Sequence, residues 1–433
     1  MPNPYVKRRA EAMVEEALLD TRVVTVNGAR QAGKSTLVRE VLRHYPRSLE
    51  RRLDRASERL GATTDPERFV RHDGLLAIDE VQRVPELILA IKAVVDDDPQ
   101  PGRFLLTGSA RLLGLRKLPD ALIGRMETVE LWPFSQGEID GTSEHFIDTV
   151  FELEPSFPGA GCESRDGYLE RALRGGFPEA VRREPRRRRR FFENYLDDLI
   201  DRDVVQLAEI ERRDQLRSLV RLLARRMAQP LSIDRLANEA SIPARTLARY
   251  LALFEEVFLI KRLDGWSASN TPRATRMRKL LFVDTGLAGD QLALSPRRLE
   301  RDQDAAGRLL ENFVLSELNR QLTWSETRAR LGHYRTKDGT EVDGILEGRD
   351  GRIVGIEVKA SSTARPEDFR GLRHLQARLG TRFHCGVLLY TGTSTVPFGE
   401  RFTAVPIDAL WCDAPADRES HDRGQTGGIK TAG

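Results

Sequence analysis

A glycine-rich segment between an expected strand and an expected helix constrains the fold of this chain more than any other feature. Residues 22–26 are mostly β-branched, which predicts a short strand, and residues 35–44 predict a helix. The segment between them has the pattern GxxxxGKS and consists of Gly28, Ala29, Arg30, Gln31, Ala32, Gly33, Lys34 and Ser35. A loop of this kind bends tightly and presents several backbone N–H groups on one side.

This pattern predicts a phosphate-binding P-loop, because both the preceding strand and the following helix are present. The N-terminal end of the helix directs its positive dipole toward bound phosphates. We expect Lys34 to reach the β- and γ-phosphates and Ser35 to ligate Mg²⁺, with Thr36 in the same binding segment. The alternative, a chance glycine-rich turn, does not account for the flanking elements. ATP and Mg²⁺ are therefore the expected ligand and cofactor.

An acidic pair supplies the second half of the expected site. Residues 75–78 form an apolar strand that ends in Asp79 and Glu80. Asp79 is expected to hold Mg²⁺, and Glu80 to polarise the water that attacks the γ-phosphate. A purely structural role for Glu80 is the alternative.

Three further side chains are candidates for the same site. The strand 103–107 is followed by Gly108 and Ser109, so Thr107 and Ser109 both lie where a polar group would contact the γ-phosphate. Arg125 is a candidate arginine finger, acting within the chain or on a neighbouring copy in a homo-oligomer. The competing interpretation of Arg125 is a surface ion pair.

The order of the expected elements predicts an α/β protein of several domains. Strands that are nearly all apolar alternate with helices up to about residue 140, which is typical of a parallel sheet covered on both faces. The expected division is an ATPase domain at 1–140, a linker or insertion at 141–167, a helical region at 168–300, a nuclease-like domain at 301–412 and a disordered tail at 413–433.

The motifs together resemble a known family, the prokaryotic AAA-type ATPases that carry a DUF4143 C-terminal region. The resemblance covers nearly the whole chain. It rests on residues 28–35, 76–82, 105–109, 123–125, 175–179, 195–198, 202–204 and 406–411. It implies a P-loop ATPase domain and a winged-helix unit in the middle region. Because members of the family are mostly uncharacterised, the resemblance predicts architecture better than biological role.

The middle region contains a helix-turn-helix pattern. Ser232 is placed to cap one helix, and a second helix is expected from Pro243 to Phe254. The segments 258–263 and 280–283 are candidates for a wing hairpin. Arg245, Thr246 and Arg249 lie away from the apolar stripe of the second helix and are candidates for contact with DNA. A packing and protein-contact module is the competing interpretation.

The C-terminal region contains acids on two expected neighbouring strands, 341–347 and 352–359. Asp343, followed by Glu357 and Lys359, resembles the PD-(D/E)xK nuclease pattern, and Glu311 matches the acid often found on the first helix of that fold. The resemblance implies that the acids bind a metal ion and that the lysine orients the attacking water. Val342 stands where the pattern has proline. An inactive nuclease-like fold is the alternative.

Composition limits the remaining possibilities. The net charge is only +3, but residues 182–190 contain seven arginines, which either attract a phosphate backbone or form a solvated helix start. No apolar run is long enough for a membrane helix, and three scattered cysteines fit a reducing compartment, so the cytoplasm is expected.

Two functions follow from these features. The first is an ATPase that acts on DNA with a metal-dependent nuclease domain. The second is a non-nucleolytic, ATP-gated switch that binds a protein partner.

Overall fold

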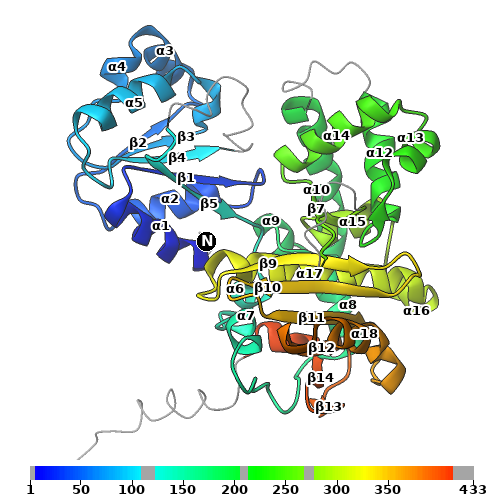
Figure 1. Ribbon diagram of the computed structural model, residues 1–433. Helices are drawn as coiled ribbons and strands as arrows, with labels where there is room; N and C mark the ends of the chain where they lie inside the picture. The colour runs from blue at the N-terminus through cyan, green and yellow to red at the C-terminus, as the bar shows by residue number, and fades with distance from the viewer. Residues whose placement is uncertain (1–4, 109–121, 205–212, 268–276, 413–433) are drawn as a thin grey trace, which may run out of the picture.

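The computed structural model describes residues 5–108, 122–204, 213–267 and 277–412. It has an ATPase domain, a helical region and a C-terminal α/β domain, arranged as Figure 1 shows. The predicted α/β class is confirmed: a parallel sheet comes first and a second, mixed sheet follows. Among the described residues, no helix has the combination of length and hydropathy that crossing a bilayer requires.

The ATPase domain is built on a five-stranded sheet of order β2-β3-β4-β1-β5 with parallel pairing throughout. Its elements are α1 (Arg9–Asp20), β1 (Val23–Gly28), α2 (Lys34–Leu42), β2 (Leu49–Arg52), α3 (Ala56–Thr64), α4 (Pro66–Phe69), β3 (Leu76–Asp79), α5 (Leu87–Asp97), β4 (Phe104–Gly108), β5 (Met126–Leu131) and α6 (Gln136–Asp140).

Helices cover both faces of this sheet. One apolar core joins the strands to α1 and α2, and a second joins them to α3, α4 and α5 on the opposite face (Figure 1). All residues of β1, β3 and β4 are buried, as strands between two helical layers must be. The carboxyl ends of β1, β3 and β4 therefore meet at one edge of the sheet.

The helical region follows. Its elements are α7 (Phe146–Val150), α8 (Arg165–Arg174), α9 (Pro178–Val181), α10 (Pro185–Asp198), a π-helix (Leu199–Val204), α12 (Arg213–Arg225), β6 (Pro230–Leu231), α13 (Ile233–Ala240), α14 (Ala244–Glu256), β7 (Ile260–Leu263), β8 (Arg278–Phe282), α15 (Thr285–Gln291) and α16 (Pro296–Arg301). The three short strands form a sheet of order β6-β8-β7.

The C-terminal domain has a six-stranded mixed sheet of order β13-β14-β12-β11-β10-β9. Its elements are α17 (Gln303–Trp324), β9 (Ala329–Arg335), β10 (Glu341–Gly348), β11 (Ile353–Lys359), α18 (Arg370–Leu379), β12 (Phe383–Tyr390), β13 (Val396–Pro397) and β14 (Phe402–Pro406). The core that includes α17 contains Val354, Ile356 and Val358, which share one face of β11 because side chains alternate along a strand. Residues of α18 pack in a separate core.

The expected linker at 141–167 is more ordered than a free connection. It contains α7, and Gly161 donates its backbone N–H to the carbonyl of Thr393 at 2.8 Å. Ala160 also forms an isolated antiparallel bridge with Ser394. This segment therefore packs on the C-terminal domain.

Candidate functional site

The P-loop lies at the carboxyl edge of the parallel sheet, between the end of β1 and the start of α2. Gly33 caps α2 in the left-handed region, with φ of 100°, where a side chain would be strained. A Cβ on Gly28 would lie 2.1 Å from the carbonyl oxygen of Leu131 in β5. The conformation at Gly33 and the close packing at Gly28 thus each require glycine, whether or not a ligand is bound.

Lys34 lies inside the loop that it is expected to serve. Its side chain is buried, and Nζ donates hydrogen bonds of 2.9 Å to the carbonyl oxygens of Gly28 and Ala29. These contacts hold the ammonium group within the phosphate-binding loop before a ligand is present.

The expected Mg²⁺ ligands face each other across the edge of the sheet. The Ser35 hydroxyl donates a hydrogen bond of 2.9 Å to Oδ2 of Asp79 at the end of β3. A hydroxyl and a carboxylate oxygen at this separation are the hard oxygen ligands that Mg²⁺ prefers. The residues present therefore fit the ion.

Thr107, at the end of β4, joins this group. Its hydroxyl donates to Oδ1 of Asp79 and accepts the backbone N–H of Glu80 at 3.0 Å. Glu80 adopts a left-handed conformation with φ of 60°, and its carboxylate accepts a hydrogen bond from Gln82. The other candidate, Ser109, lies outside the described residues.

A cavity of about 720 Å³ adjoins the P-loop and extends to the helical region. The ATPase domain contributes Arg30, Gln31, Gly33, Lys34, Ser35, Thr36, Arg39 and Glu80 to its lining. The helical region contributes Pro178, Glu179, Arg183, Phe191, Asn194, Tyr195 and Asp198 from α9, α10 and the connection between them. A nucleotide in this cavity would contact both parts of the chain.

Arg125 is the predicted residue that the fold does not bring to this site. It precedes β5, whereas the P-loop follows β1, and the two strands run parallel in register from Val23 and Met126. Arg125 is therefore about one strand length away, at the opposite edge of the sheet. Its Nε forms an ion pair with Asp96 of α5, which lowers the pKa of that carboxyl. Action on its own P-loop is excluded in this arrangement.

Arg8 was not predicted from the sequence, yet it fastens the P-loop to the rest of the domain. Its buried guanidinium donates to the carbonyl oxygens of Ala32 at 2.8 Å and Trp132 at 2.6 Å, and Nε pairs with Glu138 at 3.0 Å. No local signal distinguishes this arginine from the other charged residues near the first helix.

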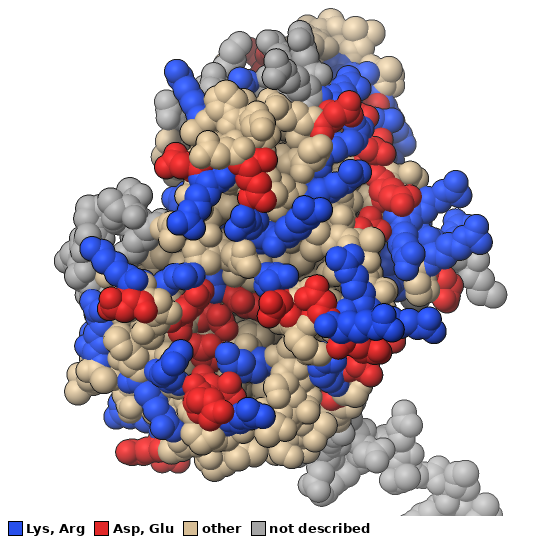
Figure 2. All heavy atoms as spheres, turned by 90° about the vertical axis from the view of Figure 1, so that its right-hand side faces the viewer, with Lys and Arg blue, Asp and Glu red and all other residues tan. Residues whose placement is uncertain are grey.

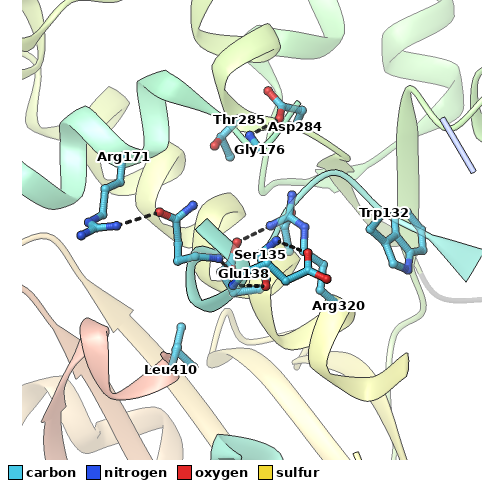
Figure 3. Close-up of polar contacts among 12 residues, drawn as sticks. Trp132, Ser135, Glu138, Arg171, Gly176, Asp284, Thr285, Arg320 and Leu410 are labelled. Atoms are coloured by element: carbon cyan, nitrogen blue, oxygen red, sulfur yellow. Dashed lines mark hydrogen bonds and ion pairs between the residues drawn. The ribbon is translucent and has the colours of Figure 1, made fainter. Parts of the chain in front are cut away.

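Buried polar groups continue from Glu138 toward the other domains (Figure 3). Ser135 caps α6, and its hydroxyl donates to Glu144 at 2.7 Å. Burial, together with the nearby charge of Glu317, raises the pKa of Glu144 to about 8. The backbone N–H of Gln136 donates to Glu317 of α17 at 3.0 Å, so the end of the ATPase domain is bonded to the C-terminal domain.

The expected helix-turn-helix consists of α13 and α14, and Ser232 caps α13 through the backbone N–H of Arg235. The apolar stripe of α14 is buried, whereas Arg245 and Arg249 are exposed and Thr246 is partly buried. Strands β7 and β8 pair antiparallel, as the predicted hairpin requires.

The arginine run, residues 182–190, extends into α10, which begins at Pro185. Most of its side chains are exposed to solvent. Arg182, Arg186, Arg187, Arg189 and Arg190 are exposed. On the face that Figure 2 shows, Lys and Arg side chains are mixed with Asp and Glu side chains, which gather near the centre of the view.

The predicted C-terminal residues come together around one cavity. Asp343, Glu357 and Lys359 line a cavity of about 270 Å³. Oδ2 of Asp343 accepts the backbone N–H of Val358 at 3.0 Å, and Oδ1 lies 3.5 Å from Nζ of Lys279. Lys279 also pairs with Glu311. Within the described ranges, no three His, Cys, Asp or Glu residues are grouped to hold a metal ion.

Comparison with known proteins gives three family matches along the chain. An AAA domain matches residues 20–140, a domain of unknown function (DUF8612) matches residues 165–298, and a domain of unknown function (DUF4143) matches residues 306–410. The fold, the P-loop and the first match place this chain in the class of AAA-type P-loop ATPases. The third match confirms the DUF4143 C-terminal region that the motifs predicted.

Relatives extend over most of the chain. An uncharacterized protein of Mycobacterium tuberculosis is 29% identical over 416 residues, which are 95% of this chain and 86% of that protein. An uncharacterized protein of Methanocaldococcus jannaschii is 21% identical over 388 residues, 86% of this chain and 83% of that one. A Walker-type ATPase of Pyrococcus abyssi aligns with 67% of this chain and 99% of its own at 16% identity and a TM-score of 0.41.

Proposed function

We propose that this protein hydrolyses ATP to ADP and phosphate and uses the bound nucleotide to hold its ATPase domain against its helical region. The observation that carries the proposal is the shared cavity: P-loop residues form one side, and residues of α9 and α10 form the other. A ligand that contacts both sides stabilises the arrangement in which they face each other.

The roles of the phosphate-site residues follow from their positions. Lys34 would bind the β- and γ-phosphates, and Ser35 and Asp79 would hold Mg²⁺. When bound, Mg²⁺ neutralises negative charge on the phosphates. Thr107 orients Asp79 and the backbone of Glu80, whose carboxylate would polarise the attacking water.

The decisive experiment compares wild-type protein with Glu80→Gln. The variant should bind ATP with about the wild-type affinity and lose at least ~100-fold in turnover. In the trapped ATP complex, α9 and α10 should be protected from limited proteolysis compared with the nucleotide-free protein. Turnover at the wild-type rate would remove Glu80 from the mechanism, and unchanged proteolysis would refute the nucleotide-dependent contact.

DNA binding is a second candidate, supported by the exposed Arg245 and Arg249 on α14. If this helix contacts a phosphate backbone, replacing both arginines by alanine should weaken duplex binding about tenfold and flatten its salt dependence. Arg301→Ala, an exposed change on α16, is the control. Equal salt dependence in all three proteins would favour a protein partner for this surface.

We propose a non-nucleolytic role for the C-terminal domain in this arrangement. The proposal is supported by the engagement of Asp343 with the Val358 N–H and the Lys279 ammonium group. The Lys279 ammonium group places a positive charge beside Asp343, and that charge opposes the binding of a metal cation there.

A further inference from the structure

Lys279 is a fully buried cation at the junction of the helical region and the C-terminal domain. It belongs to β8, and its side chain has no exposed surface. Its Nζ contacts Glu311 of α17, Oε1 of Glu341 at 3.1 Å and Oδ1 of Asp343 at 3.5 Å, the last two on β10. Three carboxylates thus surround one ammonium group.

This arrangement gives Lys279 the environment that the nuclease pattern would give to a metal ion. Glu311 and Asp343 were both expected to ligate a divalent cation, and both are ion-paired with Lys279 instead. Burial of an ammonium group without partners would be costly, and the three carboxylates around Nζ offset that cost. A buried charge is tolerated when it is paired in this way.

A second contact seats the same short sheet on the C-terminal domain. The chain after β7 runs beside β9. The backbone N–H of Trp266 donates to the carbonyl oxygen of His333 at 2.6 Å, and the backbone N–H of His333 donates to the carbonyl oxygen of Asp264 at 3.1 Å. The β6-β8-β7 sheet, which carries Lys279, is therefore attached to the C-terminal domain at a second point.

We infer that Lys279 is the resident cation of this carboxylate cluster, and that it takes the place of a divalent metal while it anchors the β6-β8-β7 sheet to the C-terminal domain. The inference does not depend on the proposed ATP hydrolysis. It predicts that a divalent cation is admitted only when the ammonium group is removed.

The test uses the full chain without nucleotide and Mn²⁺ as the probe, measured by electron paramagnetic resonance and by thermal unfolding. Wild-type protein should show no Mn²⁺ binding that depends on Asp343. Lys279→Ala should unfold at a lower temperature, bind Mn²⁺ at least about tenfold more tightly than wild type, and regain thermal stability with the ion. Adding Asp343→Asn to Lys279→Ala should abolish this binding.

Lys359→Ala is the matched control, because it removes a lysine from the cavity that Asp343 lines without vacating the position between Glu311 and Asp343. It should gain no Mn²⁺ site. Mn²⁺ binding to wild type that Asp343→Asn abolishes would overturn the inference, and this comparison holds even if Lys279→Ala does not fold. Folded Lys279→Ala without Mn²⁺ binding would overturn it as well.

Discussion

The Ser35 hydroxyl and the Asp79 carboxylate are joined by a hydrogen bond of 2.9 Å, although 44 positions separate them in the sequence. The contact exists because α2 begins at the end of β1 while β3 ends at the same edge of the sheet. The order of the strands in the sheet thus brings the two expected metal ligands together, and Lys34 of the P-loop is the neighbour of Ser35 in the sequence.

Lys34→Ala should abolish nucleotide binding and leave the protein folded. The ammonium group donates to the backbone carbonyl oxygens of Gly28 and Ala29, and its removal should cost the fold little compared with the lost phosphate contact. Fluorescent-nucleotide titration and circular dichroism measure the two quantities. Lys92→Ala on α5 is the control, and unchanged ATP affinity in Lys34→Ala would refute the P-loop assignment.

Arg8→Ala should lower the free energy of unfolding by about 3–5 kcal/mol, because it leaves Glu138 buried without its cation. It should also weaken ATP binding, since the carbonyl of Ala32 loses its donor and the P-loop loses a support. Denaturant unfolding and ATP titration measure these effects. Arg9→Ala, on the adjacent and more exposed residue, should have the smaller effect on both. Equal losses in the two variants would contradict the role given to Arg8.

Glu144 should make the protein less stable as pH rises from about 5 to 8. Its pKa is near 4.5 in an unfolded chain and about 8 in the fold, so within this window the folded state retains a proton that the unfolded state has released. The free energy of unfolding should therefore fall by about 1.4 kcal/mol per pH unit from this group. Glu144→Gln should remove that part of the slope. Parallel stability curves for the two proteins would show that Glu144 does not titrate differently on folding.

The wild-type protein should cleave no single-stranded, duplex or branched DNA in the presence of ATP and Mg²⁺ or Mn²⁺. The physical reason is the pairing of Asp343 with Lys279, which occupies a carboxylate that cleavage would need. Gel electrophoresis of the substrate panel measures the outcome. Cleavage that disappears in Asp343→Ala would instead support the nuclease interpretation.

Much of the ATPase domain could be predicted from the sequence, because local patterns specify it. Strand β1 is β-branched, and the segment before Asp79 is uniformly apolar, so their burial between two helical layers follows from composition. The apolar residues Val354, Ile356 and Val358 alternate along β11, and all three pack in the core that includes α17. The paired arrangement of Ser35 and Asp79 was expected from the motif, and the geometry agrees.

Contacts between distant segments could not be predicted in this way. Lys279 is the second residue of β8 and resembles a solvated strand end in sequence, but it is buried among carboxylates of α17 and β10. The ion pair of Arg125 with Asp96 depends on where β5 lies in the sheet, which the motif around Arg125 does not encode. Single-sequence patterns report local backbone preference, whereas these roles depend on tertiary neighbours.

The hydrogen bond from Gln136 to Glu317 has a consequence for how this chain can be divided. A fragment that ends near residue 140 would take the backbone donor away from a buried carboxylate in α17. Helix α17 also binds the chain at Val283 through Arg320 and at Leu410 through Gln321. The three matched regions are therefore not exchangeable modules. Removing one of them would leave buried polar groups without hydrogen-bond partners, both in the fragment removed and in the remaining chain.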